Sequence, residues 1–254
     1  MASFVVKFIG ALFKIPLASI IHEEGMALFN TAYNLYAVLF LVATAGLPVA
    51  ISKMVAESVA KNNHEEAKKT FHVAIWLLTV IGLLGAVSMF FGARFFANLI
   101  SSDSYLGILA ISPAIFFVAV VSAFRGYFQG HSNMTPTALS EIAEALGKLV
   151  IGLLLAYLLL PYGLPNAAAG AVLGVTAGAF FACIIMFITY VVNQNKASAT
   201  LLSARTARST SQIFRSLLKI AVPITIGSAV SSMTNIIDIV MIRQRIQSIM
   251  VTPE

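Results

Sequence analysis

Cysteine, charge and catalytic motifs are all scarce in this chain of 254 residues. The one cysteine, Cys183, excludes an internal disulfide, and the four histidines are too scattered to form a zinc-ligand pattern. No P-loop, HExxH or GxSxG motif occurs, so neither a nucleotide-driven engine nor a hydrolase of those classes is expected. We therefore expect no enzyme, no metal and no cofactor.

Apolar residues are as abundant as charged residues are scarce. The chain is 59% hydrophobic and 10% charged, whereas a soluble domain is about 45–50% apolar and about 25% charged. One globular core cannot bury this much apolar surface, so the excess must face lipid or other buried helices. This composition indicates an integral membrane protein.

Seven apolar stretches approach or exceed the ~20 residues with which a helix crosses a ~30 Å hydrocarbon core. A transmembrane barrel would instead show alternating segments of ~10 residues. The expected fold is therefore an all-α membrane protein with about seven transmembrane helices. The predicted spans are residues 3–21, 27–52, 71–93, 105–124, 139–160, 166–192 and 217–242.

Basic residues between the spans predict the orientation. If the N-terminus is cytoplasmic, Arg94 is the one basic residue in the external loops, which is a strong positive-inside signal. Arg243 and Arg245 do not fit, and they either snorkel to the interface or face a water-filled cavity. The +6 formal charge favours anionic lipids and not nucleic acid as partner. The nine basic residues assigned to cytoplasmic loops are Lys53, Lys61, Lys68, Lys69, Arg125, Lys196, Arg205, Arg208 and Arg215.

Two polar segments divide the chain. We expect residues 53–70 to continue a helix as an exposed, mixed-charge extension. The Ser/Thr/Arg-rich residues 193–216 are predicted to be a cytoplasmic linker between an N-terminal transmembrane lobe (1–192) and a final helix (217–254).

Ionisable residues inside spans usually face the protein interior or a cavity. Lys7 and Lys14 are two helical turns apart and share one face. Two ammonium groups so placed make a candidate site for an anion such as phosphate or pyrophosphate. The alternative is that each lysine snorkels toward an opposite interface.

A polar stripe marks the second span. Asn30, Tyr33, Asn34 and Ala37 follow the i, i+3, i+4, i+7 spacing of one helix face. Such a stripe either lines a hydrophilic cavity or makes interhelical hydrogen bonds. We count Asn30 and Asn34, together with Lys7, Lys14 and Arg243, as candidate substrate-binding residues.

Two further groups carry charge within spans. Glu141, Glu144 and Lys148 share one face of the fifth span, and the i, i+4 spacing of Glu144 and Lys148 favours a structural ion pair. Asp238, near Asn235 in the seventh span, needs a cation, a proton or a basic partner. The pair Asp238 and Asn235 is the candidate site for a coupling ion, Na⁺ or H⁺, with pairing to Arg243 or Arg245 as the alternative.

Small residues repeat along the sixth span. Gly170, Gly174 and Gly178 form a GxxxGxxxG run, a spacing that permits close helix approach. We expect this run to pack against a neighbouring helix.

Three segments resemble a known family. They are GLPVAISKMVAE (46–57), RGYFQGHSNMTPTALSEIAEALGK (125–148) and LLKIAVPITIGSAVSSMTNIID (217–238). Together they resemble the polysaccharide-biosynthesis exporters of the stage V sporulation protein B type. These belong to the multidrug/oligosaccharidyl-lipid/polysaccharide flippase superfamily, which includes the lipid II flippase. The resemblance covers nearly the whole chain.

This resemblance implies a function and a location. Family members have two six-helix lobes that rock around a central cationic cavity, so this chain corresponds to the N-terminal lobe plus the first helix of the second. The implied cargo is an undecaprenyl-pyrophosphate-linked sugar or peptidoglycan precursor, moved across the bacterial plasma membrane. Lys7 and Lys14 correspond to first-helix basic residues that meet the pyrophosphate in relatives. Asp238 corresponds to an acid of a sodium site in some relatives.

Two other functions stay open on the sequence. One is a multidrug-and-toxin extrusion antiporter of the same superfamily, although cationic drugs call for acidic cavities and the first span carries lysines. The other is an inactive membrane remnant or scaffold, with a separate chain supplying a second lobe if transport occurs at all.

Overall fold

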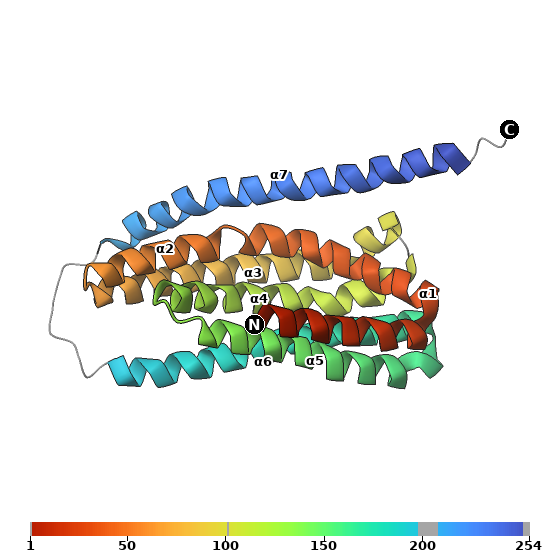
Figure 1. The fold of residues 1–254 in the computed structure, drawn as a ribbon, viewed down its shortest axis with the longest axis horizontal. Coiled ribbons are helices and arrows are strands. Elements are labelled where there is room, and N and C mark those ends of the chain that lie inside the picture. Colours follow the sequence, from red (N-terminus) through yellow and green to blue (C-terminus); the bar gives the residue numbers. More distant parts are fainter. Residues whose placement is uncertain (1, 101, 198–207, 251–254) are drawn as a thin grey trace.

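Apolar runs in a membrane become helices because the hydrocarbon offers no partner for backbone N–H and C=O groups. The computed structural model describes residues 2–100, 102–197 and 208–250, and no side chain is described at residues 2–3, 42–44, 99, 102, 194–197 or 231–250. All regular structure in the described residues is helical, which confirms the predicted fold class. The long helices lie side by side in a bundle (Figure 1).

The described residues form a series of helices along the chain. Six described helical stretches, the first spanning Phe4–Leu41, are long and apolar enough to cross a membrane. A short 3-10 helix, Ser102–Ser104, directly precedes the helix that begins at Tyr105. A second one, Leu160–Tyr162, directly follows the helix that ends at Leu159. The α-helices are α1 (Ala2–Thr44), α2 (Leu47–Ala60), α3 (His64–Ile100), α4 (Tyr105–Gly130), α5 (Thr135–Leu159), α6 (Leu164–Ala197) and α7 (Thr210–Met250).

Helix α1 is two antiparallel arms. His22, with φ 54° and ψ −170°, is non-helical, and the chain reverses there (Figure 1). We call residues 2–21 the first arm and residues 23–44 the second arm. The first two predicted spans therefore lie within one labelled helix, and the expectation of about seven membrane helices is confirmed. A break at Ala45–Gly46 separates the second arm from α2, where Pro48 occupies the first turn.

The predicted continuous helix over residues 53–70 is wrong. Helix α2 ends at Ala60, Asn62 has φ 54°, and α3 begins at His64. The Asn63 side-chain oxygen accepts the Glu66 N–H at 3.1 Å, and its amide donates to the Glu66 carboxylate at 3.1 Å. This reciprocal cap starts a new helix in place of extending the old one. Asn63 and Glu66 are buried, not exposed as expected.

The start of α7 is attached to α3. Arg208 Nε donates to Glu66 Oε1 at 2.7 Å, and Lys69 Nζ donates to the Arg208 carbonyl at 2.7 Å. Ile213 and Leu217 are fully buried, whereas Val230 is 58% exposed. Helix α7 thus packs on the bundle over its first turns and extends away from it toward the C-terminus (Figure 1). Residues 198–207 of the predicted linker lie outside the described residues, and the division into domains stays a prediction.

The three segments that carry the family resemblance pack against one another. Gly126 and Gly130 of α4 place their Cα atoms against the α2 backbone and side chains. Gly46, just before α2, lies against Ala221 and Thr225 of α7 so closely that a Cβ would overlap the Ala221 carbonyl. The motifs therefore build one continuous helix-packing region at the end of the bundle where α2 lies.

Helices α5 and α6 make the tightest contact in the bundle. A Cβ on Gly174 would overlap Gly152 of α5, and one on Gly178 would overlap the Glu144 carbonyl. At Gly170 an added Cβ would lie 2.8 Å from the Leu155 carbonyl oxygen, which is a close but less extreme approach. This close backbone approach confirms that the GxxxGxxxG run is a packing surface.

The glycine contact generates the first prediction. Gly174→Ala places a methyl group where Gly152 already lies, and the overpacking should lower the free energy of unfolding by about 1–3 kcal/mol. The measurement is the midpoint of thermal unfolding in detergent. The matched control is Gly10→Ala, where the added methyl meets no atom of the described residues within 4 Å. Unchanged midpoints for both variants would contradict the packing role.

Candidate functional site: a charged cavity inside the helical lobe

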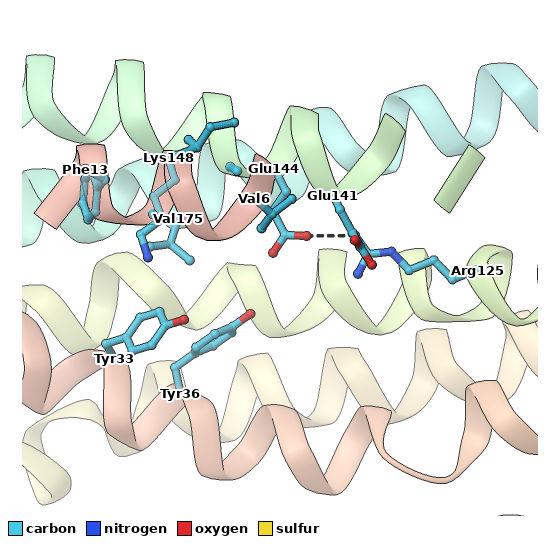
Figure 2. A pocket seen from close by; sticks show the side chains of 12 residues that line it. Val6, Phe13, Tyr33, Tyr36, Arg125, Glu141, Glu144, Lys148 and Val175 are labelled. Carbon is cyan, nitrogen blue, oxygen red and sulfur yellow. Dashed lines mark hydrogen bonds and ion pairs between the residues drawn. The ribbon is translucent and has the colours of Figure 1, made fainter. Parts of the chain in front are cut away.

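A cavity of about 270 Å³ gathers ionisable side chains within the apolar bundle (Figure 2). Both arms of α1, the end of α4, the first half of α5 and one residue of α6 surround it. Its lining residues are Val6, Ile9, Gly10, Phe13, Tyr33, Tyr36, Arg125, Glu141, Glu144, Ala145, Lys148 and Val175.

The α1 arms contribute the apolar and aromatic walls. Val6, Ile9 and Phe13 repeat at helical spacing, so they turn one face of the first arm into the cavity. Tyr33 and Tyr36 enter from the second arm (Figure 2). Tyr36 is 4% exposed, which makes the second arm a packed wall of the cavity.

An ion pair joins α4 to α5 beside the cavity. Arg125 Nη2 donates to Glu144 Oε2 at 2.9 Å, and Arg125 Nε donates to Ser140 Oγ at 3.1 Å. Ser140 Oγ donates in turn to the Thr137 carbonyl at 2.8 Å. The Arg125 and Glu144 side chains are 16% and 29% exposed. Pairing in this shielded position offsets the cost of holding both charges away from water.

The predicted ion pair between Glu144 and Lys148 is wrong, because Glu144 binds Arg125. The Lys148 ammonium lies 4.6 Å from the Tyr33 ring centroid, 4.9 Å from that of Phe13 and 5.8 Å from that of Phe29. No carboxylate of a described residue lies within ion-pair distance of it. The ring faces supply the negative potential that a carboxylate would otherwise supply.

Glu141 completes the set of charges. Its carboxylate lines the cavity one turn before Glu144 and forms no ion pair within the described part of the chain. The cavity thus has a neutralised pair in its middle, with Lys148 deeper along α5 and Glu141 nearer the start of that helix (Figure 2). In the described residues no cluster of His, Cys, Asp and Glu could hold a metal ion.

The predicted lysine site lies beside this cavity. Lys7 and Lys14 are exposed and are not among its lining residues. Lys14 directly follows Phe13, which lines the cavity. The proposal that Lys7 and Lys14 bind an anion stays a prediction.

Of the other predicted site residues, some are described by the structure and some are not. Tyr33 of the polar stripe lines the cavity, whereas Asn30 is half-buried, Asn34 is exposed and neither lines it. The backbone of α7 includes residues 235, 238 and 243. The side chains of Asn235, Asp238 and Arg243 lie outside the described residues, so their assignments also stay predictions.

Sequence reasoning missed Arg125 as a site residue. It was assigned to a loop because the apolar run ends at residue 124, but α4 continues to Gly130 and Arg125 lies within it. The turn at residues 131–134, with Asn133 accepting the Thr135 N–H at 3.2 Å and Pro136 in the first turn of α5, reverses the chain. An arginine before such a turn and a carboxylate one helix later are the signal that identifies this pair.

Comparisons with known proteins agree on the family. The profile described as "Polysaccharide biosynthesis protein" matches residues 1–250. Stage V sporulation protein B of Bacillus subtilis is 32% identical over 191 residues, 74% of this chain and 37% of that protein. The lipid II flippase MurJ of the same organism is 27% identical over 211 residues, 78% of this chain and 38% of that protein. The chain thus spans under two fifths of these relatives.

Solved structures share the fold at low sequence identity. A MATE transporter in complex with MaD3S superposes with a TM-score of 0.72 at 14% identity, over 89% of this chain and 50% of that one. A transporter of the MOP superfamily from Pyrococcus furiosus gives 0.69 at 15% identity, again over 89% and 50%. Identities this low support the fold alone.

The Arg125–Glu144 contact generates the second prediction. In a double-mutant cycle, Arg125→Gln and Glu144→Gln should show a coupling of about 1–3 kcal/mol, because residues in one ion pair are not additive. The cycle of Arg125→Gln with Glu141→Gln is the matched control, since Glu141 lies on the same helix face without this pairing. Thermal or denaturant unfolding in detergent measures both cycles, and equal coupling in the two would contradict the pair.

Proposed function

The chain belongs to the polysaccharide biosynthesis protein family, and from this premise we propose that it is part of a flippase for a lipid-linked sugar. The cargo is an undecaprenyl-pyrophosphate-linked sugar or peptidoglycan precursor, moved across the bacterial plasma membrane by alternating access. The multi-pass membrane fold and the names of the two relatives support this proposal. The observation that carries it is a cavity with charged side chains inside an otherwise apolar lobe.

The charges in the cavity suit a polar, anionic head group. Intramembrane ionisable residues mark substrate or ion pathways, and here two cations and two carboxylates line one space. Lys148 has no ionic partner among the described residues, so it is available to an anion. The lipid tail stays in the bilayer while the head group enters the protein.

Energy for transport comes from an Na⁺ or H⁺ gradient or the membrane potential, with Asp238 and Asn235 as the candidate coupling site. The N-terminus is cytoplasmic in this proposal, which places the connections after α2, α4 and α6 on the cytoplasmic side. Lys61 follows α2, and Lys196, Arg205 and Arg208 lie in the sequence at or after the end of α6, whereas residues 131–134 after α4 carry no lysine or arginine.

The multidrug antiporter is the second candidate. It is compatible with the superposition on MATE structures over about nine tenths of this chain, which supports the shared fold alone. A cation-binding pocket would need carboxylates in excess of basic groups, whereas this cavity has equal numbers of the two.

The third prediction concerns activity. In cells depleted of their lipid II flippase, this chain should restore growth only when co-expressed with a C-terminal lobe, since two lobes enclose the transport path. Growth and membrane levels of each chain are the measurements. Failure of both combinations, with the protein present in the membrane, would favour another cargo or an inactive remnant.

The fourth prediction concerns the first arm. Lys7→Gln with Lys14→Gln should abolish export of the lipid-linked sugar in that two-chain system but leave drug efflux unchanged. Lys53→Gln, at an exposed lysine of α2 outside the cavity, is the matched control. Export retained at the wild-type level would remove these two lysines from the substrate site.

A further inference from the structure

Lys148 is a half-buried lysine whose ammonium group contacts aromatic rings and no carboxylate of the described residues. Phe13, Phe29 and Tyr33 surround its ammonium at 4.9, 5.8 and 4.6 Å. An ammonium carries three hydrogen-bond donors, and ring faces do not replace three acceptor oxygens. The donors therefore remain available to a ligand that enters the cavity.

The cation–π contact is also weaker than the alternative that a phosphate offers. Charge-assisted hydrogen bonds from lysine to phosphate oxygens are short and strong, whereas the attraction to a ring face is modest. The lysine side chain is long and flexible. A phosphate within its reach would draw the ammonium away from the rings.

The surrounding charges favour an anion at this end of the cavity. Glu144 is paired with Arg125 at 2.9 Å and forms no ion pair with Lys148, so the ammonium has no carboxylate partner in the described residues.

Glu141 lies at the other end. It is seven residues before Lys148 on α5, two turns and about 10 Å along the same face. A carboxylate without an ion pair accepts hydrogen bonds, and sugar hydroxyls donate them. The cavity thus offers a cation and an acceptor at a spacing suited to the two ends of one sugar phosphate.

We propose that Lys148 is the anion-contacting residue of this site, leaving its cage of Phe13, Phe29 and Tyr33 to bind the pyrophosphate of a lipid-linked sugar whose hydroxyls contact Glu141. This inference rests on the proposed function. It deepens that function by naming two contacting residues and the orientation of the head group in the cavity. The pyrophosphate lies deeper along α5, and the sugar lies nearer the start of that helix.

The fifth prediction is a binding measurement on the whole chain in nanodiscs of phosphatidylcholine. Undecaprenyl pyrophosphate should bind, undecaprenol should not, and Lys148→Gln should weaken binding by about tenfold or more, the size of a lost charged hydrogen bond. Lys148→Arg should retain most of the affinity because it keeps the charge. Lys53→Gln is the matched control and should bind as the wild type does.

A second measurement does not depend on any variant folding. Bound undecaprenyl pyrophosphate should protect Lys148 from an amine-reactive reagent, read by mass spectrometry, while labelling of Lys53 stays the same. Unchanged labelling of Lys148 at saturating ligand overturns the inference.

The outcomes separate this inference from the function on which it rests. Wild-type binding that Lys148→Gln leaves unchanged overturns the role of Lys148 and leaves the flippase proposal standing. No binding by the wild type overturns the inference, and the two-chain growth experiment then decides the flippase proposal. Equal competition by inorganic pyrophosphate or by added phosphatidylglycerol overturns the assignment to a lipid-linked sugar, because the site would then recognise any phosphate.

Discussion

The direct contact between the α5 and α6 backbones determines where the charged cavity lies. Gly174 meets Gly152, and Gly178 meets the Glu144 carbonyl, so α5 lies directly on the backbone of α6. Glu141, Glu144 and Lys148 are all on this helix. Small residues at helix interfaces replace in lipid what the hydrophobic effect supplies in water, because lipid tails are as apolar as the helices. The positions of the charges follow from that packing.

The basic side chains inside the lobe are stabilised in two ways, by an ion pair and by contact with aromatic rings. Arg125 and Glu144 neutralise each other and tie α4 to α5, with Ser140 as a further partner. Lys148 is instead held by aromatic faces. The first arrangement is a saturated structural contact, while the second leaves hydrogen-bonding capacity unused. Two cations in one cavity can therefore differ in what they offer to a ligand.

Composition and hydropathy were enough to predict the fold, because a membrane permits few backbone structures. The glycine run on α6 was also predictable from its spacing. The charged cavity was not, because the partners Arg125 and Glu144 lie on different helices and the nearer partner by sequence, Lys148, is the wrong one. The break at residues 61–63 was missed because the Asn63–Glu66 cap was hidden in a run of good helix formers. The second family motif, residues 125–148, holds all four charged residues of the cavity, so this motif marks the site as well as the family.

Helix α7 is anchored to the bundle near its beginning and continues for many residues beyond the anchor. Glu66 and Arg208 hold its beginning, and Ala221 is pressed against Gly46. From Ala221 to Met250 it continues for about 44 Å at 1.5 Å per residue, so a tilt of about 10° at the anchored end moves the far end by roughly 8 Å. A small rearrangement among α2, α3 and the start of α7 would therefore be amplified along the helix. The anchor is the contact between Gly46 and Ala221, which also joins two of the family motifs.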